Sequence, residues 1–167
     1  MDKVATKAPS KGSATTTALQ MGLMLFLLTR LGAFVFGAWW GATAVPALRA
    51  FLQGAQIPNV EVTLDRILGL ALFPFNMAIL VVLAPLFGWW IYSRVDKARQ
   101  DVVGWLGALI FSVFDAVISL VFAGIEQHLG YVVTLIPLLI GEGIIILWVM
   151  FFMGIGFNLA KLFKAPL

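Results

Sequence analysis

Apolar residues along this chain fall into four long runs that are separated by short polar stretches. The last run is the clearest, because Val132–Leu159 is almost unbroken and holds a single acid, Glu142. A helix needs about 20 apolar residues to cross the hydrocarbon core of a bilayer, and each run is long enough to do so. The pattern therefore predicts four transmembrane helices, at about residues 18–44, 67–92, 102–125 and 132–160.

The polar stretches predict how these helices are connected. Residues 1–17 are small, polar and basic without apolar periodicity, so we expect a disordered cytoplasmic tail before one transmembrane domain at residues 18–164. The longest connection, residues 45–66, contains Pro46 and Pro58, and we expect a loop there that includes a short helix in the membrane interface. The predicted fold is all-α: a bundle of four antiparallel transmembrane helices with a flexible polar N-terminal tail.

Composition supports the membrane class. The chain has 167 residues, of which 62% are hydrophobic and 11% are charged, whereas a soluble domain has about 25% charged residues. The net charge of +3 comes from bases at the ends of the apolar runs, not from a basic patch, so we expect no nucleic-acid partner. The sequence has no cysteine, which excludes disulfides and thiolate metal sites.

The distribution of Lys and Arg predicts the orientation, because cytoplasmic loops carry an excess of these residues. Eight of them lie at one predicted membrane surface and two at the other. We therefore expect an integral protein of a bacterial inner membrane, with both termini cytoplasmic. The cytoplasmic set is Lys3, Lys7, Lys11, Arg94, Lys97, Arg99, Lys161 and Lys164, and the outer set is Arg49 and Arg66.

Three charged residues lie inside the predicted helices. At 1.5 Å per residue, Arg30 and Asp115 lie roughly 18–20 Å above the cytoplasmic ends of their helices, and Glu142 lies roughly 15 Å below the outer end of its helix. Because these depths agree, we predict a buried charge cluster of Arg30, Asp115 and Glu142. The cluster could hold the helices together, carry protons through the carboxyl groups, or pair with another subunit.

Other polar residues are expected to support this cluster. Ser112, Asp115, Ser119 and Glu126 lie near one face of the third helix, which forms a polar stripe from the membrane centre toward the outer surface. Asn76 in the second helix is the remaining candidate partner for the excess acid.

A strip of small residues, Ala33, Gly37 and Gly41, lies on the Arg30 face of the first helix. This spacing includes a GxxxG pair, which permits close helix packing, although glycine is common enough in membrane helices for the pair to arise by chance.

The sequence offers little for catalysis. It has no nucleophile motif and no metal-ligand set, and His128 lies in a predicted turn, so we expect no catalytic residues, no metal and no cofactor. The leading interpretation is a non-enzymatic subunit or assembly factor of a larger membrane complex, whose partners are the lipid bilayer and either copies of itself or other membrane subunits. The alternative is a small oligomeric ion- or proton-coupled transporter that uses the two carboxyl groups.

Overall fold

The computed structural model describes residues 13–127 and 131–164, with the side chains of residues 122–127, 131–137 and 164 left out. All regular secondary structure of the described residues is helical and includes four helices that are long and apolar enough to cross a membrane, which confirms the prediction of an all-α chain with four such helices. The elements in order are α1 (Ala14–Gly54), α2 (Val60–Arg94), the 3-10 turn η1 (Lys97–Arg99), α3 (Gln100–Gln127) and α4 (Tyr131–Lys164).

The first two helices are longer than predicted. α1 begins at Ala14 and ends at Gly54, and α2 begins at Val60. The predicted loop over residues 45–66 is therefore wrong in its extent, because only residues 55–59 are non-helical and no separate interfacial helix forms. The predicted tail overlaps the start of α1, and its residues 1–12 lie outside the described part of the chain.

The helix continues through Pro46 because contacts with α2 support the residues that follow. Proline removes one backbone hydrogen bond and bends a helix, but it does not prevent the helix from continuing where neighbouring contacts hold it. Leu52 and Leu64 are buried between the two helices, with exposed fractions of 7% and 4%. Arg49 donates two hydrogen bonds to the Glu61 carboxylate, at 2.9 and 2.8 Å, which ties the end of α1 to the start of α2.

A Schellman motif ends α1. The Ile57 N–H donates to the Leu52 carbonyl oxygen and the Gln56 N–H donates to the Gln53 carbonyl oxygen, both at 3.0 Å. This turn requires a left-handed residue, and Gln56 supplies it with φ 56° in place of the usual glycine. The chain can then reverse within the five residues before α2.

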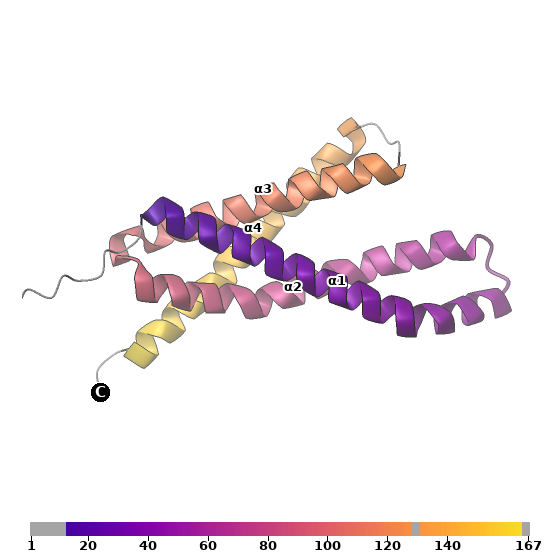
Figure 1. Cartoon of the computed structure of the whole chain (residues 1–167), viewed down its shortest axis with the longest axis horizontal. Coiled ribbons are helices and arrows are strands. Elements are labelled where there is room, and N and C mark those ends of the chain that lie inside the picture. Colours follow the sequence, from indigo (N-terminus) through magenta and orange to yellow (C-terminus); the bar gives the residue numbers. More distant parts are fainter. Residues whose placement is uncertain (1–12, 128–130, 165–167) are drawn as a thin grey trace, which may run out of the picture.

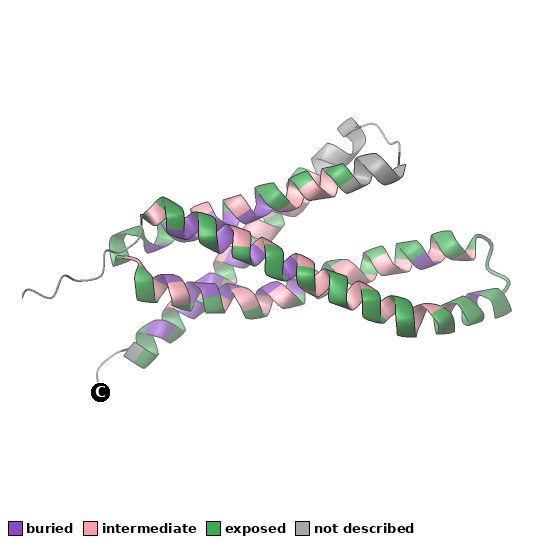
Figure 2. Ribbon diagram, viewed as in Figure 1, coloured by how far each residue is buried: buried purple, intermediate pink, exposed green. Residues whose placement is uncertain are grey.

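The four helices meet over only part of their length. α1 packs against α2 and α3, and α4 packs against α2 and α3. Figure 1 shows α1 and α2 running together to their connection, whereas α3 and α4 diverge from them. Buried residues gather where all four helices meet, and the far part of the α1–α2 pair is mostly exposed (Figure 2). The largest fully buried side chains are Phe111, Met21, Leu25, Leu80, Ile91, Met153, Val103 and Val149.

Glycines allow the closest helix contacts. A Cβ added at Gly88 of α2 would collide with the backbone of Met153 in α4, and one at Gly156 would collide with the backbone of Pro85. A Cβ at Gly22 of α1 would lie within 2.8 Å of the Gly107 carbonyl oxygen in α3. Glycine is therefore required where α2 crosses α4 and where α1 lies against α3.

Candidate functional site: a charge cluster shared by three helices

Arg30 of α1 binds α3 through an ion pair and two hydrogen bonds. Its Nη2 lies 2.7 Å from Asp115 Oδ1. The same nitrogen donates to the Asp115 carbonyl oxygen and to Ser119 Oγ, both at 3.2 Å. The structure thus brings together three of the residues that the sequence singled out, and it does so through side chains from helices that are far apart in the sequence.

Glu142 of α4 joins the same cluster. Its Oε2 accepts a hydrogen bond of 2.7 Å from Ser112 Oγ of α3. Both residues are buried, with exposed fractions of 6% for Glu142 and 4% for Ser112. The Glu142 carboxyl group also lies close enough to the Asp115 carboxyl group for the two to interact electrostatically, so the cluster connects α1, α3 and α4.

Charge balance constrains the chemistry of the cluster. When both carboxyl groups are ionised, the cluster carries one more negative charge than positive, because Arg30 supplies a single positive charge. With Arg30 positive, one carboxylate and one protonated carboxyl group give a neutral assembly. A neutral assembly avoids the large cost of an unpaired charge in apolar surroundings. The arrangement can therefore serve as a structural clamp or as a site that holds one dissociable proton.

The cluster is only partly enclosed. The side chains of Arg30 and Asp115 keep exposed fractions of 33% and 18%, whereas Glu142 is enclosed. The Arg30 guanidinium also lies 5.7 Å from the centre of the Phe26 ring, a cation–π distance, and Phe26 contacts Phe114 of α3. The ion pair is therefore partly accessible, and Glu142 behind it is not.

The two remaining polar candidates differ from Ser112 and Ser119. The Asn76 Oδ1 is buried and has no hydrogen-bond partner among the described residues, so it does not bind the cluster. Glu126 lies near the end of α3, and its side chain is outside the described part of the chain. The predicted polar stripe is consequently supported by Ser112, Asp115 and Ser119.

The strip of Ala33, Gly37 and Gly41 has a different environment from the one expected. A Cβ added at Gly37 or Gly41 would meet no atom within 4 Å. No described helix of this chain therefore packs closely on this GxxxG pair. The glycines that do admit neighbouring helices, Gly22 and Gly88 among them, lie outside the predicted strip. A small residue precedes each by four positions, Ala18 before Gly22 and Ala84 before Gly88, and this spacing is the signal that could have revealed them.

Two further observations bear on the possible chemistry. Among the described residues, no group of three His, Asp or Glu side chains could hold a metal ion. Comparisons with protein-family models, with curated proteins and with solved structures found no match to this chain. The function must therefore be inferred from the cluster, the open face of α1 and the surfaces at the helix ends.

Proposed function

We propose that this chain is an integral membrane protein of a bacterial inner membrane, with four antiparallel transmembrane helices and both termini in the cytoplasm. The start of α1, the α2–α3 connection and the end of α4 lie at the same end of the molecule (Figure 1). This end carries exposed bases, as the positive-inside rule requires of a cytoplasmic surface. The exposed bases are Arg94, Lys97, Arg99 and Lys161.

The length of α1 supports an α1–α2 connection that lies outside the membrane. At 1.5 Å per residue, the 41 residues of α1 span about 60 Å, and the hydrocarbon core is only about 30 Å thick. The charged residues Arg49, Glu61, Asp65 and Arg66 all lie near the connection. In this arrangement the two helices form a short arm on the outer side, held by the Arg49–Glu61 ion pair.

Within the membrane, the leading function is that of a non-enzymatic subunit or assembly factor. The observation that carries this proposal is the contrast between two sets of glycines. Neighbouring helices of the same chain occupy the space beside Gly22, Gly88 and Gly156, whereas the space beside Gly37 and Gly41 is empty. A GxxxG face that its own chain leaves open is suited to a helix from another subunit.

Substitution of the open glycines tests this function. In lipid nanodiscs or mild detergent, the wild-type protein is expected to run as an oligomer or to co-purify with membrane subunits. Gly41→Leu should dissociate the complex without unfolding the chain, because the added side chain meets only open space. Gly69→Leu is the matched control, since Gly69 of α2 also has no neighbour within 4 Å. A monomeric wild-type protein without co-purifying partners, or an unaffected Gly41→Leu complex, contradicts the proposal.

The alternative is an oligomeric proton-coupled transporter, and a separate observation favours it. Glu142 binds Ser112 of α3 and lies within electrostatic range of Asp115, whose side chain is 18% exposed. Neighbouring acids inside a membrane domain are suited to taking up and releasing a proton.

Proton flux into liposomes tests the alternative. Protein reconstituted with a pH-sensitive dye inside the vesicles should show flux that Asp115→Asn and Glu142→Gln each abolish. Glu61→Gln, at the outer connection, should leave the flux unchanged. Flux that survives both substitutions in the cluster, or an absence of flux in the wild-type protein, rules out this mechanism and leaves the structural function.

A further inference from the structure

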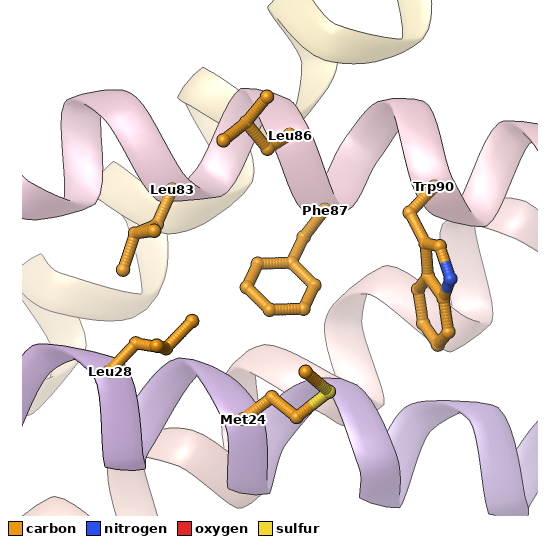
Figure 3. A pocket seen from close by; sticks show the side chains of 6 residues that line it. All are labelled: Met24, Leu28, Leu83, Leu86, Phe87 and Trp90. Carbon is orange, nitrogen blue, oxygen red and sulfur yellow. The ribbon is translucent and has the colours of Figure 1, made fainter.

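An apolar groove lies between α1 and α2 near the basic end of the molecule. It has a volume of about 260 Å³. In Figure 3, Met24 and Leu28 point from α1 toward α2, and Phe87 points back toward α1 between them and Trp90. The groove is open at the side, because the exposed fractions of Met24 and Leu28 are 50% and 40%. The lining residues are Met24, Leu28, Leu83, Leu86, Phe87 and Trp90.

A fixed positive charge lies at one end of this groove. The Arg94 guanidinium sits 5.5 Å from the centre of the Trp90 ring, a cation–π contact that holds the charge one helical turn beyond the last lining residue. Arg94 is exposed, as are Lys97 and Arg99 in the following turn, which also carries the acids Asp96 and Asp101. Three bases against two acids leave this end of the groove positive.

The length of the groove matches one leaflet of a bilayer. Leu83 and Arg94 are eleven residues apart on α2, which corresponds to a rise of about 16 Å at 1.5 Å per residue. Half of a hydrocarbon core is about 15 Å. With Arg94 at the level of the lipid headgroups, Leu83 and Leu28 therefore lie near the membrane centre, where an acyl chain of the same leaflet ends.

We propose that this groove binds an anionic glycerophospholipid of the cytoplasmic leaflet, with one acyl chain along Leu28, Leu83 and Phe87 and the phosphate on Arg94. The planar guanidinium can donate two hydrogen bonds to one phosphate group. The apolar lining binds the acyl chain of the lipid, and the positive end of the groove selects an anionic headgroup over a zwitterionic one. This inference rests on the proposed insertion into the membrane.

A second groove of the chain provides a matched comparison. It lies between α3 and α4, has a volume of about 490 Å³, and is lined mainly by Trp105, Leu106, Leu109 and Ile146. Its polar lining residue is Asp101, an acid in place of the arginine. An anionic phosphate is repelled there, so the larger groove should not select anionic lipid.

Native mass spectrometry of the full chain tests the site. Delipidated protein in detergent is titrated with phosphatidylglycerol or phosphatidylcholine, and the dissociation constant of the first bound lipid is measured. The wild-type protein should bind phosphatidylglycerol more tightly, by about fivefold for one arginine near the headgroup. Arg94→Gln should remove this preference, and Arg94→Lys should retain part of it.

Groove-filling variants separate the acyl site from general lipid contact. Met24→Trp should weaken binding of phosphatidylglycerol severalfold, whereas Leu109→Trp in the second groove should not. The two positions are matched, because each has an exposed fraction of 50%. Circular dichroism of each variant confirms that the helices are retained.

Several results would overturn the proposal. These are equal affinity for the two lipids, an unchanged preference in Arg94→Gln, or equal effects of Met24→Trp and Leu109→Trp. Vesicle flotation after carbonate extraction is measured in parallel: a wild-type protein that floats but lacks lipid preference refutes the lipid site alone, and one that fails to float refutes the proposed insertion.

Discussion

The chain contains two arginine–carboxylate ion pairs with almost the same length but different surroundings. Arg30 Nη2 lies 2.7 Å from Asp115, and Arg49 Nη2 lies 2.8 Å from Glu61. The side chains of the first pair are 33% and 18% exposed, whereas those of the second are 44% and 70% exposed. A double-mutant cycle on each pair therefore measures how burial changes the coupling free energy of an arginine–carboxylate ion pair.

We expect the Arg30–Asp115 pair to show a coupling free energy of about 2 kcal/mol. Two unit charges about 4 Å apart attract by about 4 kcal/mol at an effective dielectric constant of about 20, and the cost of removing the pair from water offsets part of this attraction. Partial exposure of Arg30 reduces it further. The Arg49–Glu61 pair should show a smaller coupling, because water and salt screen it.

The assay is reversible unfolding of the detergent-solubilised protein with SDS, followed by circular dichroism. The variants are Arg30→Gln, Asp115→Asn and their combination, with Arg49→Gln, Glu61→Gln and their combination as the matched set. Raising the salt concentration should weaken only the second coupling. Mutations that do not interact usually add to within about 0.5 kcal/mol. A coupling free energy of Arg30–Asp115 below that value, or one no larger than that of the Arg49–Glu61 pair, refutes the reasoning about the cluster.

Three further outcomes follow from the packing, each measured by the same unfolding assay. Gly88→Ala should destabilise the protein by about 2 kcal/mol, because its Cβ meets the backbone of α4, whereas Gly154→Ala, with no neighbour within 4 Å, should not destabilise it. Gln56→Gly should stabilise the α1–α2 connection by about 1 kcal/mol, because glycine adopts the left-handed conformation without strain. Ser112→Ala should cost about 1–2 kcal/mol by leaving buried Glu142 without its hydroxyl donor; a stability equal to wild type would show that water replaces the hydroxyl.

The sequence was sufficient to predict four long apolar helices, because the length of an apolar run depends only on the residues within it. It was insufficient for the boundary at Pro46, since a proline reads locally as a helix breaker. The helix continues there because Leu52 and Leu64 are buried and Arg49 binds Glu61 across the connection. Those contacts form only when α1 lies beside α2, and no local sequence pattern predicts them.

The candidate site could likewise be predicted only in part from the sequence. Depth along each helix follows from residue counts, so Arg30, Asp115 and Glu142 could be predicted to share a level. Helix packing does not follow from counts, because it depends on where and at what angle two helices cross. The GxxxG pair of Gly37 and Gly41 consequently faces open space. Asn76 illustrates the same limit, since it has a suitable side chain but does not reach the cluster.

The position of Arg30 connects the two proposed functions. Before Arg30, residues of α1 such as Ala18 and Met21 are fully buried, and after it Gly37 and Gly41 are open. Beyond the ion pair α1 continues to pack against α2, through Gly32 beside Ile79 and Phe36 on Phe75, while Gly37 and Gly41 stay open. Gly37 follows Arg30 by two helical turns, about 10 Å, so a partner helix on the open glycines would approach α1 close to the ion pair. If both functions operate, Gly41→Leu should therefore alter proton flux as well as assembly, whereas a purely structural cluster predicts loss of assembly alone.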